Sequence, residues 1–161
     1  MIKLDSHDLK ILEILQRDGR ISKVKLAEEI NLSPSPAWER LRRLEKAGII
    51  AGYHAQLDVK KLASATTVMV EVTLNHHHST DFARFEDAVR ALPEIVECHA
   101  TGGGLDYLMK VITRDVDSYQ RLMDRLLAAN IGIDRYFSYI VTKPVKEGGG
   151  LPLAQLIERN D

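Results

Sequence analysis

The order of strand-like and helix-like patterns between residues 66 and 145 constrains the fold of this 161-residue chain more than any other feature. A β-branched, apolar run, TTVMVEVTL, predicts a strand over residues 66–74. The patterns that follow predict, in turn, a helix at 81–91, strands at 95–101 and 106–113, a helix opening at Asp115 or Asp117, and a strand at 133–145. The order β-α-β-β-α-β is that of the ferredoxin-like arrangement, with two helices on one face of an antiparallel sheet. The other face is left bare, so we expect a second copy of the chain to cover it.

Three helical patterns precede this segment. The second and third are separated by NLSP at 31–34, which predicts a turn, and the third helix extends to Ala47. Residues 49–58 then predict a short strand and a linker. The candidate start and stop residues of the helices are Asp5 or Ser6, Gly19, Ser22 and Gly48.

The third helix begins with two prolines, Pro34 and Pro36. The N–H groups of a helix's first turn have no partner within the helix, so proline is tolerated there. Either Ser33 or Ser35 can act as the cap. Because the residue before a proline avoids the α region, Ser35 is slightly favoured, with Pro36 as the first helical residue.

A helical wheel divides the third helix into faces. Leu41 and Leu44 lie within about 40° of Ala37 and form a stripe that we expect to be buried. Trp38 and Arg40 lie on the flanks. The opposite, polar face contains Ser35, Glu39, Arg42, Arg43 and Lys46.

A helix, a tight turn and a second helix with an outward cationic face predict a helix-turn-helix. In this motif the N-terminal part of the second helix meets base edges in the major groove of DNA. The planar fork of arginine matches the two acceptors of guanine or of a phosphate. By its place on the wheel, Arg40 is better suited to a phosphate or a structural partner than to a base. The alternative is a solvated basic face on a scaffold helix.

Composition indicates an intracellular, globular protein. Hydrophobic residues make up 45% of the chain and charged residues 28%, and the net charge is −1. Residues 1–61 contain 12 basic and 9 acidic side chains, whereas residues 62–161 contain 10 and 14, which indicates two parts with different roles. The single cysteine, Cys98, cannot form an intrachain disulfide, and we see neither a signal peptide nor an apolar run of about 20 residues. We therefore expect a cytoplasmic protein without a membrane segment.

Four stretches together resemble one family of transcription factors. They are LDSHDLKILEILQRDGRIS (4–22), LAEEINLSPSPAWERLRRLEKAGIIAGY (26–53), VECHATGGGLDYLMKV (96–111) and SYIVTKPVK (138–146). In this order they are similar to the leucine-responsive regulator and asparagine-regulator (Lrp/AsnC, feast/famine) family. The chain differs from many members at Ala37, where they have cysteine, and at Gly104, where they have an acidic or bulky residue.

The resemblance implies an α+β protein with a winged helix-turn-helix domain, a linker strand and a ferredoxin-like domain. We place the helix-turn-helix domain at 1–50, the linker strand at 51–63, the effector-binding and oligomerisation domain at 64–147 and a C-terminal tail at 148–161. The implied partners are double-stranded DNA with a roughly palindromic operator, an amino-acid-type effector, and further copies of the chain in dimers that assemble to higher oligomers such as octamers. The predicted DNA-binding residues are Lys23, Ser33, Ser35, Pro36, Trp38, Glu39, Arg40, Arg42, Arg43 and Lys46.

The turn TGGGLDY at 101–107 is the predicted effector site. A tight strand connection needs one glycine at positive φ, and three glycines leave room for backbone N–H groups to approach a ligand carboxylate. Asp106 is suited to a ligand amino group. The family's effector lies near this turn and near the final strand, which points to Gly102, Gly103, Gly104, Asp106, Tyr107 and, more weakly, Tyr139. The alternative is that these residues only build the turn.

Other residue types give no sign of catalysis or of a cofactor. No Ser-His-Asp or Cys-His arrangement with local support occurs. The three adjacent imidazoles of residues 76–78 would splay apart, so we read them as a solvated loop and predict no metal site. We expect a regulator rather than an enzyme. The alternative function is a small-molecule-binding regulatory subunit that docks on an enzyme instead of DNA.

Overall fold

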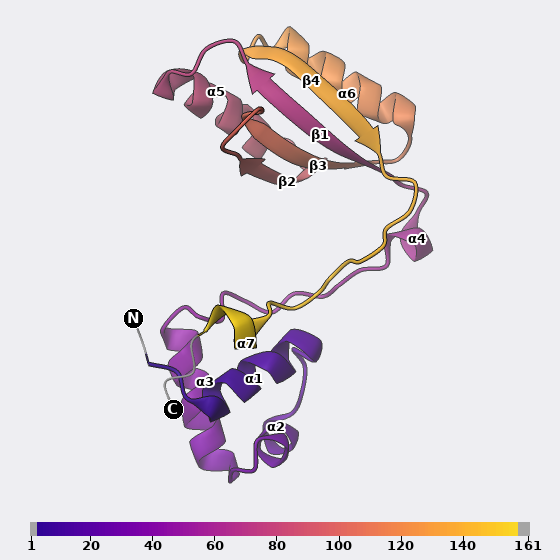
Figure 1. Cartoon of the computed structure of the whole chain (residues 1–161). Coiled ribbons are helices and arrows are strands. Elements are labelled where there is room, and N and C mark those ends of the chain that lie inside the picture. The colour runs from indigo at the N-terminus through magenta and orange to yellow at the C-terminus, as the bar shows by residue number, and fades with distance from the viewer. Residues whose placement is uncertain (1–2, 158–161) are drawn as a thin grey trace. The chain divides into compact units, whose positions relative to one another are not determined.

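The computed structural model describes residues 3–157 of the chain. The contacts between residues divide the chain into two compact units (Figure 1). Residues 3–56 together with 146–157 form the helical unit, and residues 57–145 form the sheet unit. Within residues 3–157, no helix has both the length and the apolar character that crossing a bilayer requires.

The helical unit contains α1 (Ser6–Arg17), α2 (Lys23–Glu29) and α3 (Pro34–Lys46). The Asp5 carboxylate caps α1 by accepting from the His7 and Asp8 backbone N–H groups, each at 3.0 Å. The Ser22 hydroxyl caps α2 by accepting from the Lys25 N–H at 3.2 Å. Both caps and the turn before α3 confirm the sequence prediction.

At the start of α3 the structure selects the first of the two possible caps. Ser33 is the N-cap and Pro34 the first helical residue, so Ser35 lies inside the helix although a proline follows it. Pro36 is still in the first turn, where a missing N–H leaves no acceptor unsatisfied. Asn31, with φ of 57°, gives the chain its sharp turn out of α2.

The core of the helical unit joins the three helices through one apolar cluster. Ala37, Leu41 and Leu44 are buried, as the wheel predicts. Besides these three, the buried members are Ile11, Leu12, Ile14, Leu26, Ala27, Ile30 and Leu153.

The C-terminal tail packs on the helical unit, a contact that the sequence did not predict. It contains α7 (Leu153–Leu156), and Leu153 is only 9% exposed within the apolar cluster. The Gln16 amide donates to the Leu151 carbonyl at 3.4 Å and accepts from the Leu151 N–H. The last four residues of the predicted tail, 158–161, lie outside the described residues.

The predicted linker strand at 51–63 does not form within one chain. Residues 51–58 are irregular, and α4 (Val59–Leu62) is a single helical turn. An apolar, β-prone segment becomes a strand only where a neighbour accepts and donates its backbone hydrogen bonds, and no strand of the described sheet pairs with this one.

The sheet unit has the predicted β-α-β-β-α-β order. Its strands are β1 (Thr66–Leu74), β2 (Ile95–Ala100), β3 (Tyr107–Thr113) and β4 (Ile133–Ile140), paired antiparallel in the order β2-β3-β1-β4. Helices α5 (Ser79–Arg90) and α6 (Val116–Ala128) both lie on one face (Figure 1). Alternate residues of β1, such as Val70 and Val72, are fully buried beneath them.

The other face of the sheet carries exposed aromatic side chains. On β4, Phe137 is 53% and Tyr139 52% exposed. The strand ends at Ile140, five residues earlier than predicted. Its partner β1 begins at Thr66, so beyond Ile140 only the Val141 N–H donates to β1, to the Thr67 carbonyl.

Candidate DNA-binding and effector sites

Two arginines of α3 are held by carboxylates of the first helix and its cap. Arg40 Nη1 lies 2.6 Å from Asp5 Oδ2 and 3.0 Å from Asp8 Oδ1. Arg43 Nη2 lies 2.5 Å from Asp8 Oδ2. The structural role expected for Arg40 is therefore present. Arg43, which the wheel places on the outward face, also reaches back to α1.

The charges of this cluster stabilise one another. Burial alone would raise the pKa of Asp5, but hydrogen bonds from the Asp8 backbone and from Arg40 hold that pKa below its ordinary value. Hydrogen bonding to Asp5 in turn raises the pKa of Arg40, with Asp8 contributing. Arg40 is therefore firmly charged, and part of the hydrogen-bonding capacity of both arginines is already used inside the protein.

Trp38 and Lys23 form a second structural contact of the helical unit. The Lys23 ammonium lies 3.3 Å from the centroid of the Trp38 ring, which is a cation–π interaction between α2 and α3. Trp38 itself is half-buried against the apolar cluster. The pair adds a contact between the two helices of the motif to their apolar packing.

The remaining polar residues of α3 form an exposed surface. Pro36 is half-buried beside them. Among residues 3–157, the side chains of Arg42 and Lys46 have no ion-pair partner, and Glu39 has none either. The exposed polar members of this groove face are Ser33, Ser35, Glu39, Arg42 and Lys46.

The glycine turn of the sheet unit is open, and Asp106 braces it. Gly102, Gly103 and Gly104 are exposed, and Gly103 adopts a positive φ of 131°. Asp106 Oδ2 accepts from the Leu74 N–H at 2.7 Å, and its Oδ1 lies 3.0 Å from His77 Nε2. The Asp106 carboxylate thus joins the turn to the end of β1.

The two candidate tyrosines lie on opposite faces of the sheet. Tyr107 is 2% exposed, and its hydroxyl donates to Glu86 Oε1 at 3.0 Å in the helix layer. Burial, together with Glu86, raises the pKa of Tyr107. Tyr139 pairs with Met69 on the bare face, where its hydroxyl donates to Glu71 Oε2 at 3.3 Å. Within one chain these tyrosines do not form a single pocket with the glycine turn.

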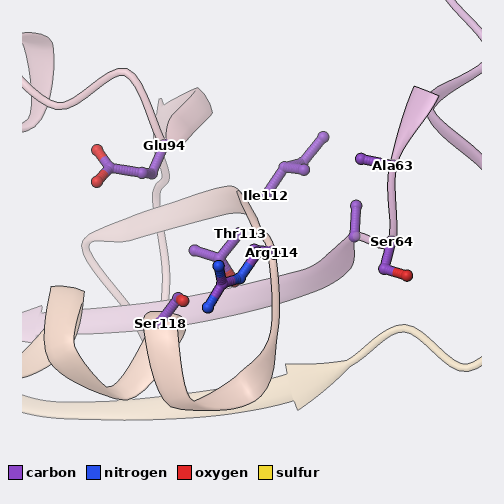
Figure 2. A pocket seen from close by; sticks show the side chains of 8 residues that line it. Ala63, Ser64, Glu94, Ile112, Thr113, Arg114 and Ser118 are labelled. Carbon is purple, nitrogen blue, oxygen red and sulfur yellow. The ribbon is translucent and has the colours of Figure 1, made fainter.

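A pocket of about 470 Å³ lies at the opposite end of β3 from the glycine turn (Figure 2). Two of its charged groups already have partners, because Glu94 pairs with Arg125 at 2.9 Å and Arg114 with Asp115 at 3.1 Å. Its lining is Ala63, Ser64, Ala65, Glu94, Ile112, Thr113, Arg114 and Ser118. In residues 3–157 no three His, Cys, Asp or Glu side chains gather as a metal site.

Comparison with known proteins assigns both units. Residues 4–51 match the model of the winged helix-turn-helix DNA-binding family, and residues 67–151 match that of the Lrp/AsnC ligand binding domain. The protein belongs to the Lrp/AsnC family. It is therefore a DNA-binding transcriptional regulator with a ligand-binding domain, and the family's members are regulators rather than enzymes.

Relatives cover nearly the whole of this Lrp/AsnC regulator. The transcriptional regulatory protein DoeX of Halomonas elongata is 59% identical over 145 residues, which are 90% of this chain and 92% of that protein. The leucine-responsive regulatory protein of Escherichia coli is 42% identical over 148 residues, 92% of this chain and 90% of its own. The L-Met complex of the Neisseria meningitidis regulator NMB0573 superposes with a TM-score of 0.90 at 33% identity, covering 96% of this chain and all of that one.

Sequence reasoning missed the acidic partners of α3 in this Lrp/AsnC regulator. A signal for Asp8 was present, because it lies three residues before Ile11 and four before Leu12, both buried, on the stripe that faces the core. A charged residue on such a stripe has to be paired. The hydrogen bond from Tyr53 to Glu45, at 2.9 Å, had no comparable signal.

Proposed function

We propose that this regulator reads roughly palindromic double-stranded DNA with the groove face of α3, one helix for each half-site. The observation that carries the proposal is the division of α3 into an anchored side and an exposed side. Arg40 is bound to α1, whereas Arg42 and Lys46 are exposed on the same rigid helix. Serine at the N-terminal part of such a helix and arginine on its exposed face are suited to base edges and phosphates. Because its target is chromosomal DNA, the protein would act in the cytoplasm.

Duplex binding at two salt concentrations tests this proposal. Affinity should fall steeply between low and moderate salt, because cationic side chains displace counterions from the phosphates. Arg42→Ala should weaken binding by about 1–3 kcal/mol if Arg42 contacts a base, without changing the melting temperature. Arg43→Ala should weaken binding and also lower stability, since it leaves Asp8 with one partner fewer. Absence of DNA binding at any salt would instead favour a regulatory subunit that docks on an enzyme.

We propose that the bare face of the sheet pairs with a second copy, and that dimers associate further. Phe137 and Tyr139 lie on this face, and solvent-exposed aromatic residues in a cluster are typical of interfaces. Light scattering on the purified protein measures the assembly. Phe137→Asp should reduce the mass toward that of one chain, and an unchanged mass would exclude this face.

We propose an amino acid or an amino-acid derivative as the effector, bound at the glycine turn. The Neisseria relative was solved with L-Met, and three exposed glycines allow close approach to backbone N–H groups. Tyr139 would belong to the site only through the interface between copies. Gly104 has no side chain to fill the space beside the turn, which favours a ligand at least as large as common amino acids.

Gly104→Ala tests the effector site without disturbing the fold. A Cβ at Gly104 would meet no atom within 4 Å, and the same is true of Gly102. A thermal-shift screen of amino acids and their catabolic intermediates first identifies the ligand by its stabilisation of the native state. Gly104→Ala should then weaken that shift, and Asp106→Ala should abolish the ligand response while DNA binding persists. Wild-type responses in both variants would place the effector elsewhere.

A further inference from the structure

One buried carboxylate ties the recognition helix to the first helix. Asp8 is fully buried, and its two oxygens contact different arginines of α3. Oδ1 accepts from Arg40 at 3.0 Å and Oδ2 from Arg43 at 2.5 Å. Oδ2 also accepts from the Asp5 N–H at 3.1 Å, which completes the carboxylate's hydrogen bonds.

The spacing of these contacts restrains how α3 can move. Residues 40 and 43 lie one turn apart, on the same side of the helix. A roll or a slide of α3 along α1 would therefore break at least one contact to Asp8. Because a buried charge that loses its partners is strongly unfavourable, Asp8 holds the helix in one position more tightly than apolar packing does.

Arg43 is anchored and exposed at the same time. Its side chain is 45% exposed although Nη2 is bound to Asp8. A guanidinium has five N–H donors in a rigid fork, so donors remain after this contact. A fork whose orientation is already set can make a two-pronged contact to guanine or phosphate with less loss of conformational freedom.

We propose that Asp8 is a positioning residue for sequence discrimination: it fixes the placement of α3 and orients the Arg43 fork toward DNA. This inference rests on the proposed function of α3 as the recognition helix. Asp8 itself touches no DNA in this arrangement. It acts through Arg43, whereas the unpaired Arg42 contributes without such a support.

The inference is tested by a ratio of affinities. The wild-type protein selects a duplex from a random-sequence pool, and a scrambled duplex of equal composition is the reference. Asp8→Asn keeps the shape but removes the charge. It should lower the selected-to-scrambled ratio about tenfold, the usual range for one good arginine–base pair. Binding to the scrambled duplex should stay equal or become tighter, because the variant has one negative charge fewer.

Arg43→Lys provides a second test that does not unbalance the buried carboxylate. It keeps the positive charge but lacks the fork, so the ratio should fall while scrambled binding is unchanged. If Asp8→Asn does not fold, an unchanged ratio in the lysine variant still overturns the inference, because Asp8 is proposed to act through the Arg43 fork. The matched control is Asp5→Ala, which removes the cap of α1 and one contact of Arg40 but none of Arg43. It should lower the melting temperature and leave the ratio unchanged.

The outcomes separate this inference from the function on which it rests. A wild-type protein that discriminates, together with an unchanged ratio in either Asp8→Asn or Arg43→Lys, overturns the positioning role alone. An equal drop of the selected-to-scrambled ratio in Asp5→Ala also overturns the positioning role, because the loss of discrimination would then follow the loss of stability. A wild-type protein that selects no duplex overturns the proposed DNA reading and the inference with it.

Discussion

Phe85 lies in the core of the sheet unit and Leu153 in the core of the helical unit. The two cores differ in how far apart in sequence their residues are. The buried cluster around Phe85 in the sheet unit comes entirely from residues 68–131. The cluster around Leu153 in the helical unit otherwise comes from residues 11–44. The sheet unit is thus built from one continuous segment, whereas the helical unit includes a segment from the far end of the chain.

The two cores also differ in their buried polar groups. Among the described residues, the buried polar or charged side chains are Asp8 in the helical unit and Thr113 in the sheet unit. Thr113 is neutral and donates to the Asp115 carbonyl at 2.9 Å. Asp8 has a carboxylate side chain, and its two oxygens contact Arg40 and Arg43. The DNA-binding unit therefore combines apolar packing with a buried ion-pair cluster, whereas the described buried side chains of the ligand-binding unit pack without a buried charge.

The largest expected effect is the loss of Phe85 from the sheet unit. Phe85→Ala should lower the free energy of unfolding of this unit by about 3–5 kcal/mol, because the residue is fully buried and its ring centroid lies 4.5 Å from that of Tyr107. Hydrogen exchange is the measurement: the amides of β1 and β3 should lose protection while those of α1 keep theirs. Equal losses in α1 would contradict the independence of the two cores.

Loss of Leu153 should have a smaller effect, in the other unit. Leu153→Ala should destabilise the helical unit by about 2 kcal/mol, at the low end for a buried leucine because a short terminal segment can readjust. Urea denaturation measures the change. Leu156→Ala on the same helical turn is the matched control, since that side chain is 62% exposed and should alter stability by less than about 0.5 kcal/mol. Similar effects of the two variants would show that the tail does not complete the core.

The same contrast explains how far the fold could be predicted. The sheet unit was predicted in order and type because alternation in its strands and spacing in its helices are local signals. The docking of the tail was missed because α7 is one turn long and Gln16 and Leu151 are 135 residues apart. The linker strand does not form within one chain, because its residues give no information about whether a pairing partner exists.

The site was predicted less completely than the fold, for a different reason. A helical wheel places Cα atoms, but the guanidinium of Arg43 lies at the end of a long side chain and reaches Asp8 on another helix. Period-two alternation along the strands, by contrast, would have assigned Tyr107 and Tyr139 to opposite faces of the sheet. Tyr107 shares a strand face with the buried Met109, whereas Tyr139 lies on the bare face.

The smallest expected effect is a pH dependence of the helical unit through Asp5. The pKa of Asp5 is lower in the folded protein than its ordinary value, so the folded state favours the ionised carboxylate. The resulting stabilisation is complete above about pH 4, the ordinary value for aspartate, and is lost as the pH falls through the lower, folded pKa. Because the Asp5 side chain is half exposed, the loss should be under about 1 kcal/mol. Urea midpoints at pH 5 and pH 3 measure it.

Asp5→Asn isolates this titration, because asparagine caps a helix about as well as aspartate but does not ionise. The variant should lose the ion pair to Arg40 and be slightly less stable at pH 5 than the wild type. Between pH 5 and pH 3 it should then lose less stability than the wild type. An identical pH dependence in both proteins would mean that other carboxylates govern the acid response. The electrostatic contrast between the units would then rest on Asp8 alone.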